Sequence, residues 1–243
     1  MSFSIDESGT HAVITKKGQK VLPLENFTGA YIRQPKIPSL NVVDDDKEFA
    51  KREIGEALKS LWRAIDDNVW LNAPHRLLRA SNKPEQLAIA SSMGFSIPDT
   101  YIGVDYETIK KFYEDHSGEI IAKAVKHGFN FDGDRARVAA TQKIDDAALA
   151  SLKEFAPIPM IFQSHIAKKY DVRVIVVGEA VFATAIESQN HEETKTDWRL
   201  SDCCKISLIQ YEISLPQKIK SLCLSITNWS VQRFMSGRHF ESW

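Results

Sequence analysis

The chain has 243 residues, of which 43% are hydrophobic, so it is long enough to bury a large core and to divide into two or three lobes. Its 31 lysines and arginines face 32 aspartates and glutamates, which gives a net charge of -1. This balance excludes the overall basic field that draws proteins to nucleic acid or to anionic membranes, and any basic site must therefore be local.

The sequence shows neither a secretory signal nor a membrane span. Residues 1–13 contain no basic region followed by an apolar run, and no apolar stretch approaches the roughly 20 residues that span a bilayer. Cys203, Cys204 and Cys223 lack metal-type spacing and an accompanying histidine pattern, which favours buried or idle thiols over a zinc or redox site. We therefore expect a cytoplasmic protein with no nucleic-acid or membrane partner.

The first part of the chain combines short strands with one helix. Strands are predicted over 11–17 and 20–24 on either side of Gly18, and a third is predicted over 29–35. The acidic stretch over 43–65 places apolar residues at helical spacing and aspartates near its start, where they suit the helix dipole. It predicts an amphipathic helix.

The middle of the chain alternates helices with strands. Ser81 or Asn82 can cap a helix that runs to Met93, and Gly94 can end it. Beyond Pro98 the pattern predicts a helix over 106–115, a strand over 119–125, a glycine loop over 126–134, a strand over 136–142 and a helix over 145–155. This order indicates an α+β lobe.

The stretch over 163–189 predicts a β-hairpin with a charged entrance. Residues 172–177 alternate in the manner of a strand, and Gly178 with Glu179 forms a plausible turn into 180–188. The charges at the entrance belong to Lys168, Lys169, Asp171 and Arg173. They are either the solvated charges of an edge hairpin or part of a binding site, and the local pattern leaves both open.

Other candidate residues also have two interpretations. Lys123 lies in an apolar strand, where it either extends outward to solvent or meets a counter-charge. The loop 127–134, with Gly128 and Gly133, can cover a phosphate or form a solvated hairpin turn. Asp132 and Asp134 within it can be metal ligands or ordinary turn residues.

Two further pairs carry charge near the hairpin. Asp171 and Arg173 are two residues apart on a strand, so they share one face and can pair there or hold an anionic ligand together. Trp198 and Arg199 can be a packed surface pair or an anion contact. The sequence offers no recognisable arrangement of a catalytic nucleophile with its base.

Five motifs, taken in order, resemble the ATP-grasp superfamily. They are "WLNAP", "SNKPEQLAIASSMGFSIPDTYI", "IIAKAV", "PMIFQSHIAKKYDVRVIVVGEAVFATAIESQ" and "TDWR", and they cover residues 70 to 200. The branch they resemble includes ribosomal-peptide maturases of the microviridin type and ribosomal-protein glutamate ligases. The region before Trp70, with "YIRQPKIP", resembles the later part of the small domain that precedes the ATP-grasp fold in this branch.

The resemblance implies an α+β fold in which two lobes clasp a nucleotide, preceded by a partial α/β pre-ATP-grasp domain. The implied boundaries are 1–75 for that partial domain, 76–160 for the N-terminal lobe and 161–243 for a C-terminal lobe that is truncated. The sequence is therefore expected to be short at its N-terminus as well.

The resemblance also implies site residues. The backbone from Gln163 through Ser164 and His165 to Ile166 would meet the adenine edge. The lysines expected near the phosphates are Lys83 and Lys123, and Gly128 would lie in the loop that covers them. Asp171, Arg173 and Arg199 would surround the phosphate and acyl-acceptor side, with the two arginines in the catalytic role.

The implied chemistry is ATP-dependent activation of a peptide or protein carboxylate, followed by attack of an amine or hydroxyl to give an amide or an ester. Mg²⁺ would normally be held by a late Asp and a Glu-x-Asn motif, but Gln232 and Arg233 stand where the Asp is expected and Glu241 is followed by Ser242. We therefore expect no metal ligands in this chain. An inactive or truncated nucleotide-binding module is the alternative to a ligase, and the substrate and oligomeric state are not predicted.

Overall fold

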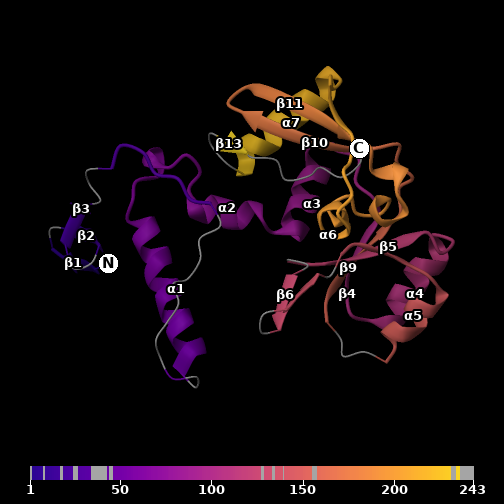
Figure 1. Ribbon diagram of the computed structural model, residues 1–243, viewed down its shortest axis with the longest axis horizontal. Helices are drawn as coiled ribbons and strands as arrows, with labels where there is room; N and C mark the ends of the chain where they lie inside the picture. The colour runs from indigo at the N-terminus through magenta and orange to yellow at the C-terminus, as the bar shows by residue number, and fades with distance from the viewer. Residues whose placement is uncertain are drawn as a thin grey trace. The chain divides into compact units, whose positions relative to one another are not determined.

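The structure, a computed structural model, describes residues 2–7, 9–16, 19–23, 27–33, 43, 46–126, 129–132, 135–138, 140–154, 158–230 and 234–235 (Figure 1). The described residues form two compact units. One contains the residues up to Arg79 together with those from Ser230 to Phe234, and the other contains Ala80–Trp229 and Met235. No described helix is both long enough and apolar enough to cross a membrane.

The first unit opens with three antiparallel strands in the order β1-β2-β3. Their bounds are Ser2–Asp6, Gly9–Lys16 and Gln19–Pro23. The two strands predicted around Gly18 are therefore confirmed. The strand predicted over 29–35 is wrong for its described part, because residues 29–33 form only an isolated bridge between Ala30 and Trp70.

Helix α1, Lys47–Arg63, is the amphipathic helix predicted from the acidic stretch. Its buried residue Leu61 packs with Ile65, Trp70 and Ala73 in the core of the first unit. After a short 3-10 turn, η3 (Asp67–Val69), comes helix α2, Pro74–Ala80, which the sequence pattern did not predict. Pro74 at the first position of α2 suits a helix start, because that N–H has no intrahelical partner.

The second unit contains two four-stranded sheets. One has the order β4-β9-β5-β8. Its strands are β4 (Thr100–Gly103), β5 (Ile120–Ala124), β8 (Gln142–Ile144) and β9 (Met160–Ser164). Helices α4 (Tyr106–Asp115) and α5 (Asp146–Leu152) pack on one face, where Ile109, Ile120, Ala122, Ile144, Leu149 and Phe162 are buried together.

Side-chain caps fix the starts of three helices in this unit. Asn82 caps α3 (Lys83–Ser92) by accepting the Glu85 N–H at 3.1 Å, which decides between the two cap candidates. Asp105 and Asp145 cap α4 and α5 in the same way. Gly94 follows α3 with a φ of +89°, a left-handed conformation that favours glycine and ends the helix as predicted.

The segment predicted as a glycine loop over 126–134 contains a strand instead. β6 (Phe129–Asp132) pairs with β7 (Arg135–Val138) as a separate two-stranded hairpin. The alternation of phenylalanine with polar residues in "FNFD" has the two-residue period of a strand. The prediction of a strand over 136–142 is right in part, since β7 ends at Val138 and β8 begins at Gln142.

The other sheet has the order β12-β11-β10-β13. Its strands are β10 (Asp171–Val177), β11 (Ala180–Ile186), β12 (Gln210–Ile213) and β13 (Phe234–Met235). The predicted hairpin is confirmed, with Gly178 at a φ of +59° in its turn. Because β10 and β11 each have a neighbour on both sides, the edge-hairpin interpretation is wrong.

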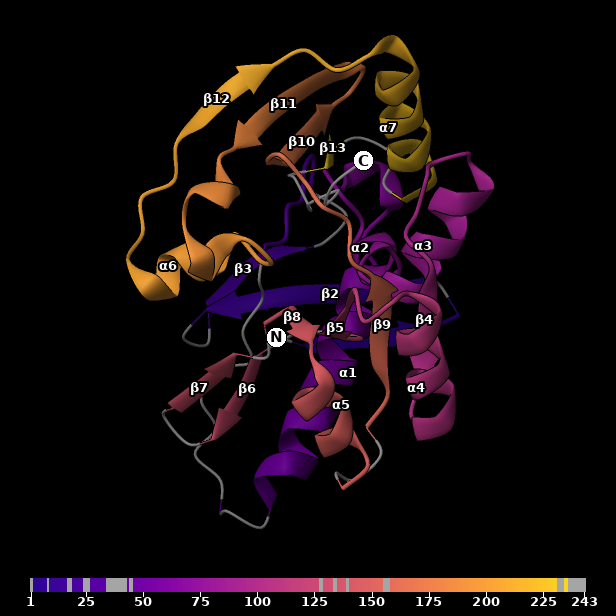
Figure 2. The same cartoon turned by 90° about the vertical axis from the view of Figure 1, so that its right-hand side faces the viewer.

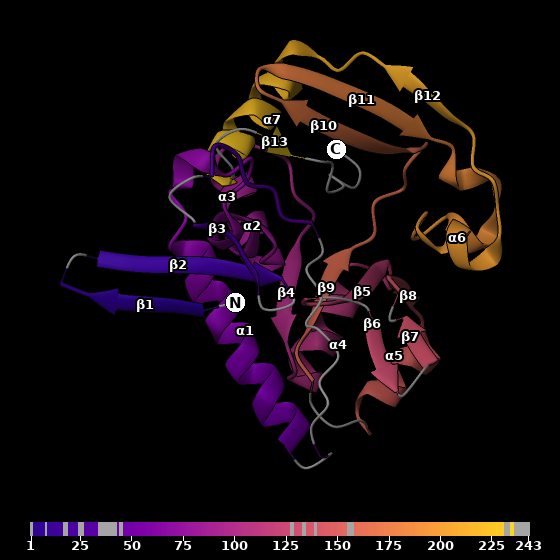
Figure 3. The ribbon, with the colours of Figure 1, turned by 60° about the vertical axis from the view of Figure 1, so that its left-hand side comes forward.

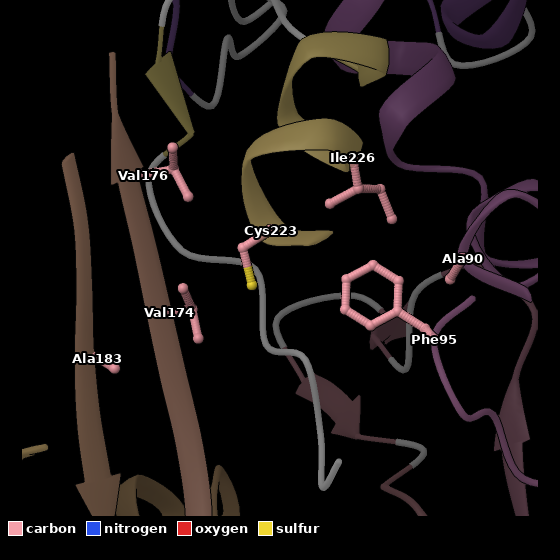
Figure 4. Packing of buried hydrophobic residues seen from close by; sticks show 7 residues of the cluster. All are labelled: Ala90, Phe95, Val174, Val176, Ala183, Cys223 and Ile226. Atoms are coloured by element: carbon pink, nitrogen blue, oxygen red, sulfur yellow. The ribbon is translucent and has the colours of Figure 1, made fainter. Parts of the chain in front are cut away.

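Helix α7, Gln217–Ser230, covers one face of this sheet (Figure 3). Figure 4 shows Val174 and Val176 of β10 pointing toward α7, which contributes Cys223 and Ile226 to the same core. The connection from β11 to β12 carries two 3-10 turns and helix α6, with bounds Ser188–Asn190 (η4), Glu192–Thr194 (η5) and Leu200–Cys204 (α6). The α+β class predicted from the sequence is confirmed.

Candidate functional site

Four of the predicted site residues, Lys123, Gln163, Asp171 and Arg173, lie on the sheet faces that look away from the helices. In β5, Ile120 and Ala122 face α4 and α5, so Lys123 points to the opposite face. The same alternation puts Gln163 of β9 on that face. In the other sheet Val174 and Val176 face α7, which leaves Asp171 and Arg173 on the face opposite the core. Figure 2 shows the two sheets one above the other, joined by the chain from β9 to β10.

The structure connects Lys83 to the strand that carries Lys123. Lys83 at the start of α3 donates from its Nζ to the main-chain carbonyl oxygen of Ala124 at 2.6 Å. Ala124 follows Lys123 in β5, so the Lys83 ammonium lies beside the main chain next to Lys123.

The segment from Gln163 to Ile166 lies at the end of β9. The side chain of Gln163 and the backbone N–H groups of the next two residues already have hydrogen-bond partners. The Gln163 side chain is 2% exposed and donates to the Thr100 hydroxyl at 2.8 Å. The N–H of Ser164 donates to the Asp99 carbonyl at 3.0 Å, and that of His165 donates to the Glu119 carbonyl at 2.8 Å. Among the described residues no hydrogen bond uses the backbone of Ile166, whose residue is 40% exposed. The N–H of Ile166 is therefore left without a partner among the described residues, unlike the N–H groups of Ser164 and His165.

Asp171 does not pair with Arg173, which was one of the two predicted arrangements. Its Oδ1 accepts from the Lys168 ammonium at 2.9 Å, a contact between two largely buried side chains. Its Oδ2 and the Nε of Arg173 are both buried and have no hydrogen-bond partner among the described residues. A buried acceptor and a buried donor on one sheet face are costly unless a ligand or solvent reaches them.

Lys168 is a contributor that the sequence interpretation left without a role. Its ammonium also donates to the carbonyl oxygen of Thr196 at 3.3 Å, so it joins the start of β10 to the loop that carries Arg199. The sequence signal was present as the spacing of Lys168 and Asp171 three residues apart. Only the fold shows that Lys168, rather than Arg173, is the partner of this carboxylate.

Arg199 forms a two-pronged ion pair with Asp197. Its Nε and a terminal nitrogen donate to the two carboxylate oxygens at 2.7 and 2.8 Å, so Arg199 is neither a stacking partner of Trp198 alone nor an isolated cation. Burial opposes the ionisation of Asp197, but the Arg199 guanidinium outweighs it, helped by the N–H groups of Arg199 and Thr141, and holds the pKa of Asp197 below its ordinary value. The Thr141 N–H lies 3.4 Å from Asp197 and links this loop to the segment before β8.

Several predicted positions lie outside the described residues or side chains. Gly128, Asp134 and Glu241 are outside the described residues, and the side chain of Asp132 is outside them as well. Among the side chains that the structure does describe, no group of three or more His, Cys, Asp or Glu residues could hold a metal ion. The described side chains thus do not by themselves form a Mg²⁺ site.

Two shallow hollows formed by described residues lie in the first unit. One is lined by Lys59, Trp62, Arg63, Pro74, His75 and Leu78. The second is lined by Asp67, Asn68, Trp70, Leu71, Asn72, Ala73 and Arg76. None of the predicted nucleotide residues lines either hollow.

Solved structures of three peptide-modifying enzymes are similar to this chain. A RiPP-associated ATP-grasp ligase from Chryseobacterium gregarium, solved with ADP and a leader and core peptide, is 27% identical with a TM-score of 0.79 over 94% of this chain and 69% of its own. The macrocyclase MdnC from Microcystis aeruginosa MRC, bound with the precursor peptide MdnA, is 22% identical with a TM-score of 0.76 over 94% and 71%. The macrocyclase MdnB from the same organism is 19% identical with a TM-score of 0.68 over 99% and 76%.

The chain has an ATP-grasp fold. The resemblance to the peptide-maturase branch of ATP-grasp enzymes, predicted from five sequence motifs, is confirmed by these structures. No protein-family model matches the sequence, and the search of curated proteins also found no match. The ATP-grasp assignment therefore depends on the three-dimensional arrangement of the two sheets, which carry four of the predicted site residues on the faces away from their helices.

Proposed function

We propose that this chain is an ATP-dependent ligase that activates a carboxylate of a peptide substrate and joins it to an amine or a hydroxyl. Three relatives with the same fold support this proposal, since two were solved with precursor or leader peptides and one with ADP. Lys83 of α3, bonded to the end of β5, and Lys123 within β5 support it as well, because lysines provide charge for phosphates.

The proposed reaction has two steps. In the first, a carboxylate oxygen of the substrate attacks the γ-phosphorus of ATP, the bond from that phosphorus to the bridging oxygen breaks, and ADP leaves. In the second, an amine or hydroxyl attacks the acyl carbon, loses its proton, and inorganic phosphate leaves with the former carboxylate oxygen. Such a transfer depends on positioning and charge stabilisation rather than on covalent groups of the protein.

The residues of this chain have distinct roles in the proposal. Lys83 and Lys123 bind the phosphates, and the unpartnered Nε of Arg173 lies on the sheet face where the acyl phosphate would form. Arg199 is held in one orientation by Asp197, which suits a guanidinium that contacts the transferred phosphoryl group. Gly128 belongs to the loop proposed to cover the phosphates.

The strongest support for nucleotide binding is the backbone of Ile166, which makes no hydrogen bond among the described residues. The N–H groups of Ser164 and His165 already have carbonyl partners, so an adenine edge would bond to Ile166 rather than to the residues before it. The exposure of Ile166 gives a ligand access to that backbone. An adenine ring presents an acceptor nitrogen and an amino group side by side, which match one backbone N–H and one carbonyl.

The test is a pair of substitutions at this position. Ile166→Pro removes the N–H, whereas Ile166→Ala shortens the side chain and keeps the N–H. We expect calorimetry to give an ADP affinity about tenfold weaker for Ile166→Pro and within about threefold of wild type for Ile166→Ala. Far-UV circular dichroism and the unfolding temperature establish that both variants fold.

Two results would contradict the assignment. If wild type binds no ADP, the chain is not a nucleotide-binding protein under these conditions and the proposal fails. If Ile166→Pro binds as tightly as Ile166→Ala while both fold, the adenine edge does not use this backbone. Peptide ligation itself is tested by acceptor-dependent phosphate release with Mg²⁺, ATP and carboxylate-bearing peptides.

A further inference from the structure

The backbone of the nucleotide segment depends on two carbonyl groups from outside its own strand. Ser164 donates to the carbonyl oxygen of Asp99, and His165 donates to that of Glu119. These two bonds fix the direction in which the chain leaves β9 and thereby the position of Ile166. Whatever holds Asp99 and Glu119 in place therefore also positions the proposed adenine contact.

A single residue, His116, is bonded to both of them. Its ring Nε2 lies 3.1 Å from the Asp99 carboxylate oxygen Oδ2. Its main-chain carbonyl accepts the N–H of Glu119 at 3.0 Å. His116 is the C-terminal cap of α4, so it connects the end of this helix to both residues that bind the segment.

The ring of His116 is placed between two oxygens that only accept hydrogen bonds. Its Nδ1 lies 2.8 Å from the main-chain carbonyl of Phe112, and its Nε2 faces the Asp99 carboxylate. A neutral imidazole has one N–H and can satisfy only one of these contacts, whereas an imidazolium donates to both. The geometry thus favours the protonated form, because only that form satisfies both contacts.

The surroundings agree with that requirement. The Phe112 carbonyl at the helix end, followed by the Asp99 carboxylate, raises the pKa of His116 above its ordinary value, with burial opposing and the charges of Asp99 and Asp115 adding to the effect. These two carboxylates are the charged groups that act on the ring from α4 and from the segment before β4. The Phe112 ring packs against it with centroids 4.3 Å apart.

We propose that His116 is a positioning residue for the nucleotide segment, and that its protonation and nucleotide binding favour each other. The proposal rests on the proposed function, since it assumes that ADP or ATP binds at Ile166. His116 itself does not touch the nucleotide. Its ring acts by holding Asp99, whose carbonyl accepts from Ser164. Its main-chain carbonyl holds Glu119, whose carbonyl accepts from His165, and that contact does not change with protonation.

The sign of the pH dependence follows from the raised pKa. Both ring contacts are complete well below pH 6.5, and one is lost as the pH rises through the raised value. Protonated His116 should therefore strengthen nucleotide binding at low pH. This contribution should disappear at high pH, where His116 is neutral. By linkage, the factor by which protonation of His116 strengthens ADP binding equals the factor by which bound ADP strengthens proton binding to His116. ADP must therefore raise the pKa of His116.

The test compares wild type with His116→Gln, which can still donate to Asp99 but carries no charge. ADP binding is measured by calorimetry at pH 6.0, 7.5 and 9.0. The terminal phosphate of ADP itself titrates near pH 6 and affects both proteins equally. We therefore compare, at each pH, the dissociation constant of His116→Gln with that of wild type, as a ratio. We expect His116→Gln to bind about three- to tenfold more weakly at pH 6.0 and equally at pH 9.0.

A matched control is His75→Gln, which removes another partly exposed histidine that faces a carboxylate, in this case Asp67 at 3.5 Å in the first unit. It should behave as wild type at every pH. An NMR titration of the His116 ring in wild type, assigned through its own backbone, provides a second readout that does not require the variant to fold. We expect a pKa above 6.5 that rises further when ADP is added.

The outcomes separate the inference from the proposed function. If wild type binds ADP but the ratio is the same at all three pH values, or the ring pKa does not move with ADP, the positioning role is overturned and the nucleotide site stands. If wild type binds no ADP at any pH, both the proposed function and this inference are overturned. A ratio that falls with pH together with an ADP-dependent pKa supports the inference.

Discussion

The ammonium of Lys83 is bonded at 2.6 Å to the carbonyl of Ala124, the residue directly after Lys123. This contact joins the start of α3 to the end of β5, the strand that carries Lys123. If both bind phosphates, replacing Lys123 by alanine removes one charge-assisted contact. We expect the ADP affinity to fall by about 1.5–3 kcal/mol, which is roughly 10- to 150-fold.

Calorimetry of ADP binding checks this expectation. Lys51→Ala is a suitable control, because Lys51 lies on the exposed face of α1 and pairs with Glu48. It should bind ADP as wild type does. Equal affinity in Lys123→Ala and wild type would remove Lys123 from the proposed phosphate site.

The ion pair of Asp197 with Arg199 leads to a prediction about the loop before α6. Asp197→Asn keeps the shape of the side chain but removes the charge that holds the guanidinium, and we expect a loss of about 1–3 kcal/mol in the free energy of unfolding. Because Arg199 would then adopt several orientations, ligase turnover should fall more than ADP binding. Urea unfolding and single-turnover kinetics provide the two measurements.

The same pair has a defined pH dependence. The pKa of Asp197 is lowered from an ordinary value of 3.8, so its stabilising contribution is complete above that value and is lost as the pH falls through the lowered pKa. Wild type and Asp197→Asn should therefore differ by a constant amount from pH 5 to pH 8 and converge in stronger acid. A difference that grows between pH 5 and pH 8 would point to another group.

The three cysteines should divide into two classes of reactivity. Cys203 and Cys204 are exposed, whereas Cys223 is buried in the core beside Val174, where burial raises the pKa of its thiol to about 11. Ellman's reagent at pH 8 should modify two thiols rapidly in the native protein and the third only after unfolding. Cys223→Ala should leave the rapid count unchanged.

The core under the hairpin predicts a large packing effect. Phe95 is 5% exposed and lies in one cluster with Ala90, Cys223 and Ile226 (Figure 4). Phe95→Ala should destabilise the second unit by about 3–5 kcal/mol, because it removes the ring and leaves a cavity. Leu61→Ala makes the corresponding change in the core of the first unit. If the two units unfold separately, calorimetry should show two unfolding transitions. Phe95→Ala should then lower the temperature of one transition, and Leu61→Ala should lower the temperature of the other.

The sequence correctly predicted the helices and strands that are specified by neighbouring residues, through caps, apolar spacing or alternation. α3 and α4 follow from a capping side chain and from apolar spacing, and the hairpin follows from alternation around Gly178. The failed or missing predictions depend on distant partners. Residue 30 bridges only to Trp70, and β12 is short and largely exposed and becomes a strand by pairing with β11.

The same division applies to the site. The sequence motifs named Lys83, Lys123 and the segment ending at Ile166, but the bond from Lys83 to Ala124 spans 41 positions and has no local signature. The local pattern also suggested Arg173 as a partner of Asp171, whereas the chain path into β10 brings Lys168 to that carboxylate. Contacts of this kind depend on how the loops cross, which spacing along a strand does not specify.

The position of Lys83 as the first residue of α3 has an energetic consequence. Asn82 caps this helix, so the lysine ammonium is attached where the helix dipole is positive and disfavours a cation. The helix would be better served by a neutral or acidic residue. Lys83→Gln relieves this repulsion of about 0.3–1 kcal/mol, but it also removes the charge-assisted bond to the Ala124 carbonyl, which contributes about 1.5–3 kcal/mol. We therefore expect the free energy of unfolding to fall by about 1 kcal/mol while ADP binding weakens. An anion that arrives at this end of α3 meets both the dipole and the ammonium, so the local repulsion in the unliganded protein is relieved when phosphate binds.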